Sequence, residues 1–298
     1  MIDGIVLSSN SIDLRQRIEA SPLLSETLRN HTTIKTGENY TTAKYNDVEF
    51  TIFSSGRIQI RGSLHKYYNC ISNNFIGKQK HNANDFNIAD IKGVLVSLSA
   101  SFGPEILNCK VDSIEFGLNV NTSCSARYFI EQNITLLKSG ARLKNPIIEN
   151  SIHGFNCGVK YIFCDYWLKV YDKGAMYNIS ETLLRCEYKA LKMRVIKDAK
   201  LTTLSDISDK NALQVLFNNL IDIYGYLLIR EQFNEKDFSA NDLRLYDQGF
   251  NPDYWKGIDR QERKRKKKQF DKLYADHAKT NLKGEILNLL TTKFSELT

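Results

Sequence analysis

Residues 166–194 read YWLKVYDKGAMYNISETLLRCEYKALKMR and contain two segments in which polar and apolar side chains alternate. Such alternation predicts a pair of β-strands, each with one face toward the core. The outer face of the first strand would carry Lys169, Tyr171 and Lys173. The outer face of the second would carry Arg185, Glu187 and Lys189. A tyrosine, a carboxylate and several cations are therefore expected side by side on a half-solvated surface.

A third alternating segment lies upstream, where residues 111–121 read VDSIEFGLNVN. Its polar face would carry Glu115, Asn119 and Asn121, opposite an apolar face that begins with Ile114. Polar residues on the outer face are expected of any half-buried antiparallel sheet, so the alternation alone does not define a functional site. It does predict that the three strands present their polar side chains together.

The remaining patterns favour an α+β fold, an antiparallel sheet with helices on one face. Strands are expected at residues 3–7, in three runs within 31–62 and in two within 146–163, with a loop at 63–74. Helices are expected at residues 11–20, 84–101 and 125–139. After Lys200 the sequence becomes helical, starting with a stripe from Leu213 to Leu228 capped by Ser208 or Asp209. Four more helices are expected, at residues 240–247, 252–258, 260–277 and 281–296. We interpret residues 1–200 as one domain and 201–298 as a helical, basic region.

The composition is that of an ordinary globular protein, with 42% hydrophobic and 25% charged residues among 298. No apolar run reaches the length of a membrane span, and the first residues lack the pattern of a signal peptide. The six cysteines contain no CxxC pair and the histidines no HxH or HxxH pair, which argues against a zinc site. We expect reduced thiols, a cytoplasmic location and no membrane partner.

The net charge is 41 − 34 = +7, and much of it falls in RQERKRKKK at residues 260–268. Like charges this dense repel one another, which indicates either a polyanionic partner or a solvated helix. If the partner is DNA, the candidate phosphate contacts are Arg263, Lys264, Lys266 and Lys267.

The three alternating segments resemble those of rolling-circle replication initiators, a family that includes the staphylococcal-type plasmid initiators and the gene II replication proteins of filamentous phage. YWLKVYDK is similar to the family's I-R-I-Y-[DN]-K strand, LLRCEYKALK to its R-[VW]-E strand, and DSIEFGLNVN to its upstream acidic strand. The resemblance covers roughly residues 1–195 and lies in these three short motifs. It departs from the family at Glu115, where an aspartate is usual, and at Asn119 or Asn121, where a second acid is usual.

Carried onto this sequence, the resemblance implies that Tyr171 is the DNA-cleaving nucleophile. It also implies that Glu115, Glu187 and Asn119 or Asn121 hold a divalent metal. Oxygen ligands point to Mg²⁺ or Mn²⁺. Lys169 and Lys173 would lower the pKa of the phenol and hold the phosphate, while Arg185 and Lys189 would contact DNA.

The expected function is that of a site-specific endonuclease and ligase for single-stranded DNA that starts rolling-circle replication of a plasmid or phage in a bacterial cytoplasm. Tyr171 would form a 5′-phosphotyrosyl link and leave a 3′-OH for host polymerase and helicase, with the initiator acting alone or as a homodimer. A relaxase or transposase with the same tyrosine chemistry and a non-catalytic DNA-binding protein are the alternatives.

Overall fold

A computed structural model describes residues 1–33, 37–139, 142–144, 147–150, 156–180, 182–233 and 238–298. Its centre is a ten-stranded sheet in the order β2-β3-β4-β5-β1-β6-β12-β11-β10-β9, with every neighbouring pair antiparallel. The strands are β1 (Ile2–Ser9), β2 (Arg29–Thr32), β3 (Asn39–Tyr45), β4 (Val48–Phe53), β5 (Ile58–Ser63), β6 (Lys110–Asn121), β9 (Ile147–Asn150), β10 (Asn156–Ile162), β11 (Tyr166–Asp172) and β12 (Leu183–Ala190). The predicted antiparallel α+β fold is confirmed.

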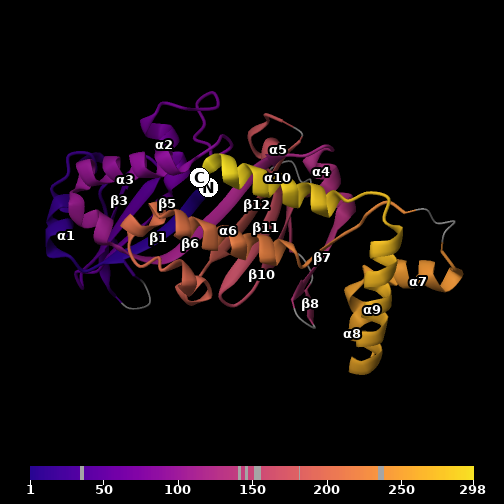
Figure 1. Ribbon diagram of the computed structural model, residues 1–298. Helices are drawn as coiled ribbons and strands as arrows, with labels where there is room; N and C mark the ends of the chain where they lie inside the picture. The colour runs from indigo at the N-terminus through magenta and orange to yellow at the C-terminus, as the bar shows by residue number, and fades with distance from the viewer. Residues whose placement is uncertain (34–36, 140–141, 145–146, 151–155, 181, 234–237) are drawn as a thin grey trace.

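Helices cover one face of this sheet, and Figure 1 shows α3, α6 and α10 lying across it. The helices are α1 (Ile12–Glu19), α2 (Leu64–Ile71), α3 (Ile88–Phe102), α4 (Ala126–Tyr128), α5 (Lys173–Tyr177), α6 (Lys210–Tyr224), α7 (Ala240–Gly249), α8 (Pro252–Lys256), α9 (Arg260–His277) and α10 (Leu282–Leu297). The apolar side chains of β6 face this layer, and the ring of Phe116 meets that of Phe294 in α10 at a centroid distance of 6.3 Å. Burial of these apolar surfaces is the main force that holds the layers together.

Short 3₁₀ segments connect several of these elements: η1 (Ser25–Thr27), η2 (Pro104–Asn108), η4 (Met193–Ala199) and η5 (Leu204–Ser208). A second, three-stranded sheet has the order β13-β7-β8, formed by β13 (Leu227–Ile229), β7 (Ile134–Ser139) and β8 (Arg142–Lys144). No helix in the described ranges is long and apolar enough to cross a membrane.

Three local expectations from the sequence are wrong. The helical stripe expected from Leu213 to Leu228 is too long, because α6 ends at Tyr224 and Leu227 and Leu228 lie in β13. Residues 63–74 were expected to form a loop but contain α2, whose first turn is capped because the Ser63 hydroxyl accepts a hydrogen bond from the Lys66 N–H. The helix expected over residues 125–139 ends early. It consists of α4 and the π-helical turn η3 (Phe129–Asn133), after which the chain enters β7. β7 pairs with β13, a partner about 90 residues away that no local pattern reveals.

The C-terminal helices divide between two apolar clusters. α6 and α10 contribute Leu213, Leu216, Leu290 and Phe294 to the core beneath the sheet. The helices α7, α8 and α9 form a cluster of their own around Trp255 and Phe270, at the end of the molecule beyond β7 and β8 (Figure 1). The division at residue 200 stays a prediction, although α6 and α10 share the core of the preceding residues.

A candidate metal centre beside a buried tyrosine

The central strands place the polar residues of the alternating segments on one face of the sheet. Tyr171 lies directly opposite Arg185, and Arg185 lies opposite Asn119. In the same way, Lys169 is paired with Glu187, and Lys189 is paired with Glu115. Residues that are directly opposite in an antiparallel pair point to the same side. The expectation that these side chains share a face is confirmed.

Two glycines make room for the large side chains on this face. A Cβ on Gly117 would lie 3.0 Å from Nη2 of Arg185 and 2.9 Å from the carbonyl oxygen of Cys186. A Cβ on Gly158 would lie 2.5 Å from the Cβ of Tyr171. The absence of a side chain at both positions therefore lets Arg185 and Tyr171 lie flat against the neighbouring strands.

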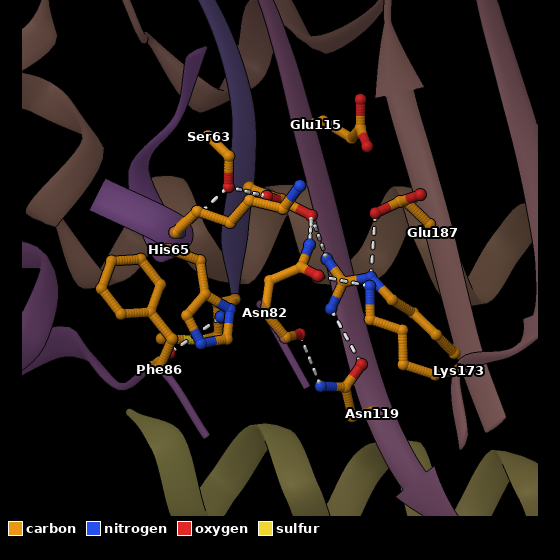
Figure 2. Close-up of polar contacts among 12 residues, drawn as sticks. Ser63, His65, Asn82, Phe86, Glu115, Asn119, Lys173 and Glu187 are labelled. Carbon is orange, nitrogen blue, oxygen red and sulfur yellow. Dashed lines mark hydrogen bonds and ion pairs between the residues drawn. The ribbon is translucent and has the colours of Figure 1, made fainter. Parts of the chain in front are cut away.

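Three carboxylates meet on this face, from three adjacent strands. Asp3 comes from β1, Glu115 from β6 and Glu187 from β12, and one oxygen of each lies within 4.8 Å of the other two. Figure 2 shows the carboxylates of Glu115 and Glu187 pointing toward one another. A shift of register between Ile2 and Ile5, where β1 meets β6, accompanies the placement of Asp3 in this group.

The guanidinium of Arg185 joins two of these carboxylates. Its Nε donates to Glu187 Oε1 at 2.9 Å, its Nη2 lies 3.4 Å from Asp3 Oδ2, and its Nη1 donates to Asn119 Oδ1 at 3.0 Å. Glu115 is paired instead with Lys189, at 3.1 Å between Oε2 and Nζ. Arg185 thus fixes the positions of Asp3 and Glu187 and offsets part of their charge.

Asn82, in the segment between α2 and α3, closes the cluster from the other side (Figure 2). Its Nδ2 donates to Asp3, while its Oδ1 accepts from Tyr177 Oη at 2.8 Å and from Lys173 Nζ. The backbone carbonyls of Asn82 and Ala83 accept from Asn119 Nδ2 at 3.2 and 3.0 Å. These hydrogen bonds tie the segment to the sheet and cover the polar side chains.

The expectation that these side chains lie on a half-solvated surface is wrong for the centre of the site. Relative exposure is 4% for Tyr171, 3% for Glu187, and 1% for both Arg185 and Lys173. Burial follows from the cover that Asn82 and α5 provide, and a strand pattern cannot reveal such a cover. Charged groups this deep are stable only when paired and hydrogen-bonded, as they are here.

Burial and neighbouring charges change the ionisation of the carboxylates in opposite directions. Burial, the nearby Glu187 and the nearby Asp3 raise the pKa of Glu115 to about 8, although Lys189 opposes the change. Burial would also raise the pKa of Asp3, but Arg185, Lys173 and the Ser63 hydroxyl outweigh it and hold that pKa at about 2. At neutral pH Asp3 is thus ionised, whereas Glu115 is mostly protonated because ionising it beside two other buried carboxylates is costly.

The tyrosine and the lysine beside it also differ from the expectation. Burial raises the pKa of Tyr171 well above its ordinary value, and Glu187 raises it further. Burial and Arg185 lower the pKa of Lys173 to about 7. Lys173 Nζ donates to Tyr171 Oη at 3.2 Å, and Lys169 Nζ lies 4.3 Å above the centre of the Tyr171 ring. The expectation that the lysines lower the phenol pKa is wrong, because burial has the larger effect.

The three carboxylates fit a divalent cation. They supply the oxygen ligands that such ions prefer, and one oxygen of each lies within 4.8 Å of the other two, so small movements would bring all three to one ion. Burial and the like charges of Glu187 and Asp3 raise the pKa of Glu115, and a bound cation would offset both the burial of its charge and this repulsion. We conclude that Asp3, Glu115 and Glu187 form a candidate metal site.

Asn119 and the basic helix take different positions from those expected. The Asn119 amide is committed to Arg185 and to the backbone of Asn82 and Ala83, and Asn121 lies at the exposed end of β6. Arg185 is bonded within the site and presents no surface to DNA in this structure. In α9, Phe270 is buried. Arg263, Lys266 and Lys267 lie on the same side of the helix as Phe270 and are only partly exposed. The exposed lysines and arginines of α9 are Arg260, Lys264, Arg265, Lys268 and Lys272.

The sequence analysis did not identify Asp3 or Asn82. Asp3 is a carboxylate inside an otherwise apolar run, IDGIVL, and a buried acid in a central strand is a signal that could have been used. Asn82 lies in a segment rich in asparagine that has no periodicity, so only the folded chain reveals its role.

Comparison with known proteins adds no assignment. A scan against protein-family models finds no match, and a search of curated proteins finds none either. The geometry of the site therefore carries the functional interpretation.

Proposed function

We propose that this protein is a metal-dependent tyrosine nickase and ligase of single-stranded DNA, of the kind that initiates rolling-circle replication. The observation that carries the proposal is the meeting of Glu115 and Glu187 with a third acid, Asp3, on the sheet face that also holds Tyr171. Glu115, Glu187 and Tyr171 are the residues that the motif resemblance singles out. Their convergence is not required by the alternation alone, because each strand could have shifted in register.

Each residue has a role in this proposal. Tyr171 Oη attacks the scissile phosphate and takes the 5′ side of the strand, leaving a 3′-OH for a host polymerase. Asp3, Glu115 and Glu187 would hold Mg²⁺ or Mn²⁺, which supplies positive charge to the phosphoryl oxygens as they become more negative. Arg185 positions two of these carboxylates. Since the phosphotyrosyl link preserves the energy of the phosphodiester bond, the 3′-OH can rejoin the strand by the reverse reaction.

Access to Tyr171 requires a local opening. DNA can reach its hydroxyl only if the segment that carries Asn82 moves away, since Tyr171 is nearly inaccessible in this structure. The hydrogen bonds that hold this segment over Tyr171 include those of Asn82 with Asp3, Lys173 and Tyr177 and those of Asn119 with the backbone of Asn82 and Ala83. We expect DNA binding to exchange some of these bonds for contacts with phosphate.

Covalent capture of DNA tests the proposal. The protein is incubated with Mn²⁺ and a labelled library of random single-stranded oligonucleotides, denatured, and analysed for DNA–peptide adducts. We expect an adduct on Tyr171, dependent on the metal and absent in Tyr171→Phe. Tyr177→Phe is the matched control, because it removes a buried hydroxyl from the same site and should keep the adduct.

The possible outcomes separate the alternatives. Binding of DNA without an adduct would favour a non-catalytic DNA-binding protein, a reading that the burial of Tyr171 supports. An adduct on another tyrosine would refute the assigned nucleophile. Transfer of the captured strand to a second molecule, rather than rejoining, would point to a transposase.

A further inference from the structure

The structure raises a question about the proton of Tyr171. A phenol attacks phosphorus far better once its proton is lost, yet burial keeps the pKa of this hydroxyl well above its ordinary value. At neutral pH the tyrosine is therefore protonated. A nucleophile of this kind needs a base within hydrogen-bonding distance.

Lys173 occupies the position of such a base. Its Nζ lies 3.2 Å from Tyr171 Oη. Within the described part of the chain, this is the hydrogen bond of the Tyr171 hydroxyl. Lys173 is the first residue of α5, and the Asp172 side chain caps this helix by accepting from the Ala175 N–H at 2.7 Å. Lys173 is buried, with a relative exposure of 1%. Its Nζ lies 5.2 Å from the ring centre of Tyr171 and 5.0 Å from that of Tyr177.

The groups that face Lys173 come from several elements. Asp3 of β1 and Glu187 of β12 favour its charged form, whereas Arg185 of β12 and Lys66 of α2 oppose it. His81 and the hydroxyls of Tyr171 and Tyr177 complete its titratable surroundings. Burial has the largest effect and, together with Arg185, brings the pKa of Lys173 to about 7. A neutral amine with a lone pair is thus accessible at this position near neutral pH.

We propose that Lys173 is the general base that accepts the proton of Tyr171 during strand cleavage and returns it during rejoining. This inference rests on the proposed nickase function. In cleavage, the O–H bond of Tyr171 breaks as an N–H bond forms on Lys173, the Oη–P bond forms and the P–O3′ bond breaks. The leaving 3′ oxygen takes a proton from water. In rejoining, the 3′-OH attacks phosphorus, its proton passes to water, and the departing phenolate is reprotonated by the Lys173 ammonium.

Lys169 is a different kind of neighbour. Its Nζ lies 4.3 Å above the ring centre of Tyr171, on the face of the ring rather than at its hydroxyl. A cation in that position interacts with the ring electrons and is not aligned to receive the proton. Lys169 is therefore the matched control for Lys173, since both are lysines in contact with the same tyrosine.

The first test does not depend on activity. The ¹⁵Nζ resonances of the lysines are followed by NMR between pH 5 and 11 in the metal-free protein, and Lys173→Met identifies the signal of Lys173. We expect this signal to titrate near pH 7. A titration near pH 10.5, the ordinary value for lysine, would overturn the role as a base.

The second test uses the oligonucleotide that the wild-type protein captures from the random library, in single-turnover adduct formation as a function of pH. A base must be neutral to act, so the rate should rise with pH and level off above about 7. If Lys173 instead acts as a cation, the rate should fall over the same range. Lys173→Arg separates the two roles further, because arginine keeps the charge but cannot accept a proton.

We expect Lys173→Arg and Lys173→Met to slow adduct formation by about 10²- to 10⁴-fold, the usual contribution of general base catalysis. Lys169→Met removes a cation but not the base, so its rate should still rise with pH and level off above about 7, whereas the rate of Lys173→Met should lose this dependence. Methylamine should partly restore the rate of Lys173→Ala, which a purely structural role would not allow. Full activity of a folded Lys173→Arg variant would overturn this inference and leave the nickase proposal intact. Failure of the wild-type protein to form any adduct would overturn both.

Discussion

The crowding of the three carboxylates predicts that Glu115→Gln stabilises the metal-free protein. The pKa of Glu115 is raised from the ordinary 4.5 to about 8, first by burial and then by Glu187 and Asp3. Between these two values the folded state binds more protons than the unfolded state, so the stability of the wild type falls as the pH rises. Glutamine occupies the same space, can still donate a hydrogen bond to Glu187, and carries no charge at any pH.

The magnitude follows from the two pKa values. A pKa change of one corresponds to about 1.4 kcal/mol, so the wild type loses about 1 kcal/mol by pH 5 and about 3 kcal/mol by pH 7 relative to its protonated form. Urea denaturation in the presence of EDTA should therefore show Glu115→Gln to be more stable by these amounts. Lys189, the partner of Glu115, is partly exposed and loses little when the charge is removed.

Mn²⁺ should reverse the order of stability. A cation present at 1,000 times its dissociation constant adds about 4.1 kcal/mol to the wild type, which exceeds the difference of about 3 kcal/mol at pH 7, and the variant, with one ligand fewer, should gain much less. Glu49→Gln serves as a control, since Glu49 lies in β4 of the same sheet and pairs with the exposed Lys44 at 3.1 Å. Equal stabilities of wild type and Glu115→Gln from pH 5 to pH 8 would refute the idea of a crowded carboxylate site.

Two further predictions concern cations. Arg185→Leu should reduce the free energy of unfolding at pH 7 by about 3–5 kcal/mol, because it leaves Asp3 and Glu187 buried without their partner. Urea denaturation measures this loss, and Arg61→Leu, at an exposed position, is the control. A loss below about 1 kcal/mol would contradict the prediction. The simultaneous change of Arg260, Lys264 and Lys268 to Ala, on the exposed stripe of α9, should reduce the log–log salt slope of duplex binding by about 2–3 if each residue contacts one phosphate. The matched control changes Lys92, Lys197 and Lys210, which are exposed on other elements, and parallel slopes for the two triple variants would exclude α9 as a DNA contact.

Much of the fold could be predicted from local patterns. The alternation in residues 111–121 and 166–190 predicted β6, β11 and β12, because one face of each strand packs against helices. The same alternation predicted that the side chains of Tyr171, Glu187 and Glu115 lie on one face of the sheet. The C-terminal helices were predicted within a few residues at either end, since their caps and apolar stripes are local features. Strand β7 was missed, because its pairing with β13 is a long-range contact.

The depth of the site was decided only by the tertiary structure. A strand pattern shows which side chains share a face, but not what covers that face, and here Asn82 and α5 cover it. The cover removes water from Tyr171 and Lys173, and loss of water opposes charge on both groups. The tyrosine becomes harder to ionise and the lysine easier to neutralise, which is the reverse of what two exposed neighbours would do. Asp3 reaches the cluster from a strand more than 100 residues away in sequence from Glu115, and only the pairing of β1 with β6 brings the two carboxylates together.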